Sequence, residues 1–177
     1  MSTNFRIGHG YDLHCLIPGE SLTLGSVKIP CAFQIVAHSD GDVVLHAICD
    51  ALLGAIAQGD IGQHFSDTDM NNAKRDSREF LRYCWQLVQT AGYQLSNIDV
   101  TIIAQAPKIA PYVLAMRTAI AEELATAIMN ISVKATTNEG VDAIGRKEAI
   151  AVHAVVLLER EKECQQIPQN KTEKCGS

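Results

Sequence analysis

Two side chains that could bind one metal ion, Asp12 and His14, lie two residues apart near the start of the chain. In an extended segment, side chains at this spacing project from the same side, as two ligands of one ion must. His46 is the best candidate for a third ligand, and either Asp42 or Asp50, one helical turn away, could orient its imidazole. Three ligands of mixed oxygen and nitrogen type leave the fourth tetrahedral position of zinc open, which is the catalytic arrangement. The alternative is an ordinary turn and a packed core histidine.

Other polar groups occur where the chain would leave a strand or enter a helix. Residues 38–42 precede an apolar stretch, and the positive N-terminal end of a helix there would favour an anion, although simple capping is the other interpretation. Asp60-Ile61-Gly62 and Asp67-Thr68-Asp69 could bind hydroxyls or a cation, or simply form turns. Lys108 and the run 134–139 could meet a phosphate at strand ends, or be structural.

Composition limits the possible partners. The chain has 177 residues, 47% of them hydrophobic, a formal net charge of -5 and a pI near 5.6. Nucleic acid or an anionic membrane is therefore not suggested as a partner, and phosphates would have to be neutralised locally. The longest apolar run, 43–57, contains His46 and Asp50 and is too short to span a membrane. The first residues lack the pattern of a signal peptide, so we expect a cytoplasmic protein.

The six cysteines have no Cys-x-x-Cys spacing. In a chain expected to stay in the cytosol, they are interpreted as free thiols, mostly in the core.

The elements that must position these side chains alternate between strand and helix. The pattern predicts an α+β fold, with one compact domain over 1–158 in which helices cover a mixed sheet, and a polar, disordered tail over 159–177. Strands are expected at 5–10, 21–29, 100–105, 131–135 and 150–158; helices at 43–57, 76–92 and 111–124; and a long loop at 59–74. His9 and His153 alternate within strands and are interpreted as packed or edge residues.

Six motifs, in this order, resemble the signatures of the 2-C-methyl-D-erythritol 2,4-cyclodiphosphate synthase family over 5–158. They are Gly8-His9-Gly10-Tyr11-Asp12-x-His14; Ala37-His38-Ser39-Asp40-Gly41-Asp42 leading to His46; Gly59-Asp60-Ile61-Gly62; Phe65-x-Asp67-Thr68-Asp69; Ala104-Gln105-Ala106-Pro107-Lys108; and Lys134-Ala135-Thr136-Thr137-x-Glu139. Several long motifs in the family's order are far more specific than any one of them.

The resemblance implies a homotrimer with active sites at the subunit interfaces. It implies conversion of 4-diphosphocytidyl-2-C-methyl-D-erythritol 2-phosphate to the cyclic diphosphate and CMP, in the non-mevalonate route to isoprenoid precursors. By the same resemblance, Asp12, His14 and His46 bind a zinc-like ion, Glu139 helps to hold magnesium or manganese at the diphosphate, and His38 and Thr137 steady the transition state. The implied substrate-binding residues are Ser39, Asp60, Ile61, Gly62, Phe65, Ser66, Asp67, Thr68, Asp69, Ala104, Gln105, Ala106, Pro107, Lys108, Ile109, Ala110, Thr136, Asn138, Ala143 and Arg146.

One stretch departs from the family pattern. Where the family usually has Gly-Phe-x-Gly-Arg-x-Glu-Gly, this chain reads Asp142-Ala143-Ile144-Gly145-Arg146-Lys147-Glu148-Ala149. Gly145, Arg146 and Glu148 remain, but Ala143 replaces the aromatic residue. In the family this region is associated with a central cavity of the trimer and with binding of isoprenoid diphosphates.

Two other functions remain open. A metal-dependent phosphohydrolase would use the metal to activate water, and its products would be ring-opened rather than cyclic. A structural metal or nucleotide-binding module would have a fourth protein ligand, and its His46→Ala variant would unfold.

Overall fold

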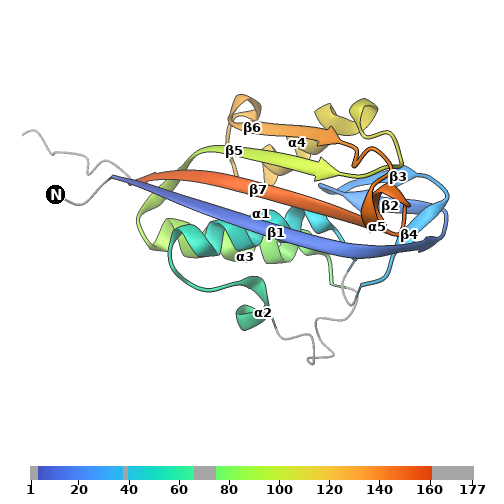
Figure 1. Cartoon of the computed structure of the whole chain (residues 1–177). Coiled ribbons are helices and arrows are strands. Elements are labelled where there is room, and N and C mark those ends of the chain that lie inside the picture. The colour runs from blue at the N-terminus through green and yellow to red at the C-terminus, as the bar shows by residue number, and fades with distance from the viewer. Residues whose placement is uncertain (1–3, 38–39, 66–74, 161–177) are drawn as a thin grey trace, which may run out of the picture.

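The computed structural model describes residues 4–37, 40–65 and 75–160 (Figure 1). Its main sheet has five strands in the order β4-β1-β7-β5-β6, and a two-stranded hairpin lies beside it. β5 and β6 are parallel, and the other neighbouring strands of the main sheet are antiparallel. The strands are β1 (Phe5–Pro18), β2 (Ser21–Leu24), β3 (Val27–Pro30), β4 (Phe33–Ile35), β5 (Tyr93–Ile103), β6 (Ile131–Thr136) and β7 (Ala149–Arg160).

The long helices α1 and α3 lie on one face of this sheet (Figure 1). α1 is apolar nearly all round and is buried between the sheet and α3, as expected for a core helix. The helices are α1 (Val43–Ala55), α2 (Ile61–His64), α3 (Ser77–Thr90), α4 (Val113–Glu123) and α5 (Asp142–Gly145), with short 3-10 turns at Ala110–Tyr112 and Ile128–Asn130. A single α+β domain with a mixed sheet, as expected, is confirmed for the described residues.

Two glycines of β1 let α1 approach the sheet closely. A methyl group on Gly8 would clash with the carbonyl oxygen of Ala51, and one on Gly10 would clash with that of Ala47. Glycine is therefore required at both positions by the backbone of the helix. This close contact brings α1, which carries His46, directly against the strand that carries Asp12 and His14.

The opposite face of the sheet exposes apolar side chains along β1 and β7. Alternate residues of β1 point away from α1, so the strand buries its glycines and exposes its large side chains. The exposed apolar residues of these two strands are Phe5, Ile7, Tyr11, Leu13, Ile17 and Val155. We call these six residues the open-face patch.

Most differences from the sequence-based prediction concern element ends. β1 continues eight residues beyond the expected end at Gly10, since it pairs with β7 as far as Cys15 and with β4 as far as Pro18. The extended segment 21–29 is a hairpin, and the turn that the sequence predicts at Gly25-Ser26 is confirmed, because both residues adopt positive φ angles between β2 and β3. The prediction that 59–74 is a loop was wrong at Ile61–His64, which form α2.

The C-terminal part of the domain also differs in detail. β7 ends at Arg160, two residues beyond the expected end at Leu158, because Glu159 and Arg160 pair with β5. Residues 161–177 of the expected tail lie outside the described residues. The short helix α5 was not predicted from the sequence.

Four cysteines lie within the described residues, and all four are free thiols. Cys49 and Cys84 are buried, Cys31 is half-buried and Cys15 is exposed, so only two of them belong to the core. Among the described helices, none is long and apolar enough to cross a membrane.

Candidate active site

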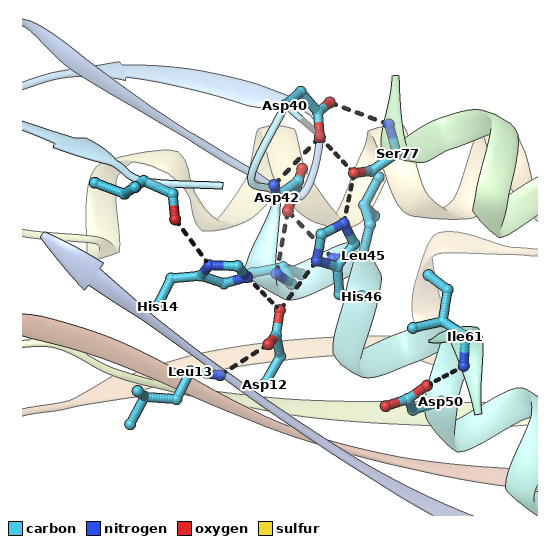
Figure 2. Close-up of polar contacts among 12 residues, drawn as sticks. Asp12, Leu13, His14, Asp40, Asp42, Leu45, His46, Asp50, Ile61 and Ser77 are labelled. Carbon is cyan, nitrogen blue, oxygen red and sulfur yellow. Dashed lines mark hydrogen bonds and ion pairs between the residues drawn. The ribbon is translucent and has the colours of Figure 1, made fainter. Parts of the chain in front are cut away.

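Asp12, His14 and His46 converge on one point between β1 and α1 (Figure 2). The Oδ2 atom of Asp12 lies 3.1 Å from Nε2 of His14 and 3.0 Å from Nδ1 of His46. One donor atom from each of the three side chains lies within 4.8 Å of the other two. This donor set fits zinc, which takes imidazole nitrogen and carboxylate oxygen at about 2.0–2.2 Å. The expected grouping of the three side chains is confirmed, and it is the only cluster of three or more such ligands among the described residues.

Local structure explains the convergence. Asp12 and His14 are both in β1 and point toward α1, as their spacing predicts. His46 lies in the first turn of α1, where its backbone N–H donates to the carbonyl of Asp42. The helix therefore begins close enough to β1 for one imidazole to reach the Asp12 carboxylate.

Asp12 is the charged centre of the cluster. Burial alone would raise its pKa, but hydrogen bonds with His14 and His46, and the charge of these rings, hold the pKa well below its usual range. The backbone N–H of Leu13 also donates to Asp12 Oδ1 at 2.9 Å. Asp12 is therefore an anion at neutral pH, which is the form that binds a cation.

The ring nitrogen of each histidine that faces away from Asp12 has its own partner. Nδ1 of His14 lies 3.3 Å from the carbonyl oxygen of Val36, and Nε2 of His46 lies 2.9 Å from Oγ of Ser77. Metal-binding histidines are usually held in this way through the nitrogen that does not face the ion. The two rings are thus already oriented for a metal.

The expectation that Asp42 or Asp50 orients His46 was wrong. Ser77, 31 positions further along the chain, contacts the ring instead. Its hydroxyl is in short contact with Oδ1 of Asp40. Sequence spacing gave no signal for Ser77, because it approaches His46 only when α3 packs beside α1, whereas Asp40 belongs to the polar run 38–42.

Asp42 has a structural role at the start of α1. It is fully buried and accepts hydrogen bonds from the backbone N–H groups of Gly25, Ser26, Val44 and Leu45. Burial raises its pKa to about 6, although these backbone donors partly oppose the shift. The capping interpretation of this segment is correct for Asp42, which joins the β2–β3 hairpin to the helix.

Asp50 holds the segment that carries the expected Asp60-Ile61-Gly62 motif. Its Oδ1 accepts a hydrogen bond from the N–H of Ile61 at 2.8 Å, and burial raises its pKa. Asp60 itself is exposed and caps α2 through the N–H of Gln63. Because α2 contacts α1, this motif lies on the same side of the sheet as the metal cluster.

Phe65 follows α2 and packs against α3. Its ring centroid lies 4.6 Å from that of Phe80 and 5.0 Å from that of Tyr83. Its role within the described structure is therefore packing.

The other residues that the resemblance implies near the metal cluster fall outside the described structure. They are His38, Ser39, Ser66, Asp67, Thr68 and Asp69.

The expected nucleotide-binding residues form a second group, at the ends of β5 and β6. The N–H of Ala104 donates to the carbonyl of Thr136, and the N–H of Gly140 donates to Oε1 of Gln105. These bonds tie segment 104–110 to segment 136–140. Lys108 and Ala110 are exposed, and Ala106, Pro107 and Asn138 are half-buried. Ile109 is buried in the core and therefore does not present its side chain to a ligand.

Thr137 and Glu139 belong to this second group. The Thr137 hydroxyl donates to Oε1 of Glu139 at 3.0 Å, and both side chains are exposed. β6 is separated from β1 by β7 and β5, so three inter-strand steps, about 14 Å, lie between the two strands. The strand that precedes Glu139 is therefore remote in the sheet from the strand that carries Asp12 and His14.

The segment that departs from the family pattern forms α5. Ala143 is half-buried against a small apolar cluster of Ile144, Ala149 and Ala151, and Arg146 is exposed and paired with Glu148 at 2.9 Å. His9 and His153, interpreted as packed or edge residues, pair with each other through Nε2 and Nδ1 at 3.0 Å on the open face of the sheet.

Comparison with known proteins places the chain in one family. The model of the YgbB family matches residues 5–159, and the chain belongs to this family. It is 57% identical, over 86% of its length and 98% of the relative, to the 2-C-methyl-D-erythritol 2,4-cyclodiphosphate synthase of Ectopseudomonas mendocina (strain ymp). The enzyme of the same name from Shewanella sediminis (strain HAW-EB3) is also 57% identical, over 88% of this chain and 96% of that one.

Solved structures agree with this assignment. The IspF–CDP complex of Plasmodium falciparum superposes with a TM-score of 0.81 at 36% identity, over 92% of this chain and 100% of that one. The bifunctional IspDF of Campylobacter jejuni has a TM-score of 0.86 at 40% identity, and this chain covers 43% of that longer protein. The family resemblance seen in the motifs is confirmed.

Proposed function

We propose that this protein converts 4-diphosphocytidyl-2-C-methyl-D-erythritol 2-phosphate to 2-C-methyl-D-erythritol 2,4-cyclodiphosphate with release of CMP, in the non-mevalonate isoprenoid pathway. The observation that carries the proposal is the Asp12, His14 and His46 cluster, in a chain 57% identical to synthases of that name. The CDP bound to a neighbouring structure supports a cytidine nucleotide as ligand.

The cofactors are two divalent cations. Asp12, His14 and His46 would hold zinc, and Glu139 would contribute to a magnesium or manganese site at the diphosphate. When bound, these cations neutralise the phosphate oxygens and polarise the phosphorus under attack. An acidic chain has particular need of them, because its formal net charge of -5 gives no general attraction for phosphates.

The chain's own residues position the substrate. A phosphate monoester has a second pKa near about 6, so the 2-phosphate is largely a dianion at neutral pH and needs no strong base. One of its oxygens attacks the β-phosphorus, the bond from that phosphorus to the bridging oxygen breaks, and CMP leaves with that oxygen. In-line geometry is the main requirement, and rigid binding of both ends of the substrate provides it.

Two groups of residues would hold these two ends. His38, Ser39, Asp60, Ile61, Gly62 and segment 65–69 would contact the methylerythritol phosphate near the zinc ligands. Segment 104–110, Thr136 and Asn138 would hold the cytidine diphosphate, with Lys108 near its cytosine or phosphates. Thr137 and His38 would donate hydrogen bonds to oxygens whose charge grows in the transition state.

The assembly in this proposal is a homotrimer with active sites at the subunit interfaces. β1, which carries Asp12 and His14, and β6, which ends shortly before Glu139, are three inter-strand steps apart, about 14 Å, and a second subunit would bring its Glu139 to the zinc centre. The open-face patch supplies an apolar surface on which subunits could associate. Ala143 and Arg146, at one end of this face, would then lie near the centre of the assembly.

Product analysis tests the proposal. The protein with zinc and magnesium should convert the cytidine diphosphate substrate to CMP and a cyclic diphosphate in equal amounts, as measured by chromatography and phosphorus NMR. Release of CMP with a ring-opened phosphate would instead indicate a phosphohydrolase. Binding of the substrate without CMP release would indicate a binding module.

A further inference from the structure

Ser77 lies between the metal ligand His46 and the carboxylate of Asp40 (Figure 2). It is the first residue of α3 and is fully buried. Its hydroxyl oxygen lies 2.9 Å from Nε2 of His46 and makes a short contact with Oδ1 of Asp40. A buried hydroxyl with two polar neighbours must donate to one and accept from the other.

The number of available hydrogens fixes the direction of these bonds. The Asp40 carboxylate acts as an acceptor, since it also accepts from the N–H of Ser77 at 3.1 Å and from the N–H of Asp42 at 3.3 Å. The single hydroxyl hydrogen of Ser77 therefore points to Asp40. The remaining lone pairs of Ser77 face His46, so Nε2 of the ring must carry a hydrogen and donate it.

This assignment determines which ring nitrogen can bind a metal. With the hydrogen on Nε2, the neutral imidazole offers its lone pair at Nδ1. Nδ1 is the nitrogen that faces Asp12, 3.0 Å from Oδ2. In the other tautomer Nδ1 would instead donate to Asp12, and one hydrogen bond would occupy two of the three metal ligands.

We propose that Ser77, held in place by Asp40, is a positioning residue that keeps His46 in the Nε2-protonated tautomer and aims Nδ1 at the metal. The inference rests on the proposed metal centre and adds to it the residues that prepare one of its ligands. Neither Ser77 nor Asp40 belongs to the three-ligand cluster itself. They disfavour the tautomer in which Nδ1 of His46 carries the only hydrogen and donates it to Asp12, so that Nδ1 is available to the ion.

Zinc affinity of the metal-free protein, measured by competition with a chromophoric chelator, is the first test. Ser77→Ala should weaken zinc binding about 10–100-fold, the usual effect of removing a group that orients a metal ligand. Ser77→Thr keeps the hydroxyl and should restore most of the affinity. Asp40→Asn keeps an oxygen that can accept from Ser77 and should weaken binding less than Ser77→Ala.

Asp76→Ala is the matched control. Asp76 caps the same end of α3 through the N–H of Arg78 and pairs with the guanidinium of Arg78. The control should lower the stability of the helix end and leave zinc affinity nearly unchanged. Equal losses of affinity in Asp76→Ala and Ser77→Ala would reduce Ser77 to a structural residue and overturn the proposal.

The second readout is the tautomer of His46 in the metal-free protein, from nitrogen-15 NMR of labelled histidine, with His46→Gln used to assign the signal. The wild type should show a hydrogen on Nε2, where Ser77 accepts it, and Ser77→Ala should show a smaller fraction of rings that carry this hydrogen. A wild-type ring protonated on Nδ1 alone would refute the inference. A wild type with the expected tautomer that fails to bind zinc would instead contradict the metal centre of the proposed function.

Discussion

Asp12 contacts both histidines of the metal cluster, so its charge holds the arrangement together. Its Oδ2 atom is the shared partner of His14 and His46, at 3.1 Å and 3.0 Å. An amide at this position keeps the shape of the side chain but removes the negative charge that a cation requires.

We therefore expect Asp12→Asn to bind much less zinc and to lose at least about 100-fold in CMP release, because a metal ligand is lost while the fold is kept. Metal content and the rate of CMP release measure the two effects. Asp99→Asn is the control, since Asp99 is exposed and pairs with Lys134 away from the cluster. A metal-depleted Asp12→Asn protein with full activity would refute the assignment of Asp12.

The burial of Asp42 gives a pH dependence of stability with a definite sign. Its pKa is about 6 in the folded protein, against about 3.9 in an unfolded chain, so the folded protein binds this proton more tightly. The stabilisation is complete below about pH 4 and is lost as the pH rises through about 6.

Wild type should accordingly lose roughly 1–3 kcal/mol of unfolding free energy relative to Asp42→Asn between about pH 4 and pH 7. Urea titrations across this range measure the difference. Asp99→Asn should show a small change of opposite sign, because a hydrogen bond with Lys134 lowers the pKa of Asp99. A difference between wild type and Asp42→Asn that does not vary with pH would show that Asp42 is ionised throughout.

At the scale of elements, the contact between β1 and α1 sets the distance between the zinc ligands. Gly10 lies against the carbonyl of Ala47, one residue after His46. A side chain at position 10 would push the helix away from the strand and separate His46 from Asp12.

Gly10→Ala should therefore destabilise the fold by about 2–4 kcal/mol, comparable to other overpacked or strained core positions, and should weaken zinc binding as well. Chemical denaturation and chelator competition measure the two effects. Gly54→Ala, in the same helix with open space around it, should leave zinc binding unchanged and raise stability by up to about 1 kcal/mol. Similar behaviour of the two variants would show that the close approach of α1 does not control the site.

At the scale of the whole molecule, the open-face patch and the two separate groups of site residues both bear on how subunits would assemble. Ile7, which belongs to this patch, is 71% exposed in the single chain. A charge there would not disturb the core of one subunit, but it would be costly in an apolar interface.

Ile7→Asp should consequently remain folded, sediment as a monomer and lose CMP release, whereas wild type should sediment as a trimer. Analytical ultracentrifugation with circular dichroism separates assembly from folding. Leu114→Asp is the matched control, because Leu114 is also exposed but lies near the N-terminus of α4, where an acidic side chain is tolerated. A monomeric and fully active Ile7→Asp protein would contradict active sites at subunit interfaces.

The sequence by itself determined the features that depend on neighbouring residues. The spacing of Asp12 and His14 placed both on one side of a strand, and the apolar run after Asp42 predicted the helix that carries His46. These predictions succeeded because strand alternation and helix capping are properties of a few consecutive residues. The family motifs were equally readable, since each is a short, ordered string.

Only the tertiary structure decided which distant residues meet. Ser77 reaches His46 across 31 positions, whereas Asp42 and Asp50, the neighbours on the helix, turn to other partners. The strand order likewise places β6, which leads to Glu139, three inter-strand steps from β1. Such contacts follow from the packing of α3 on α1 and from the pairing of strands far apart in sequence, which local spacing does not encode.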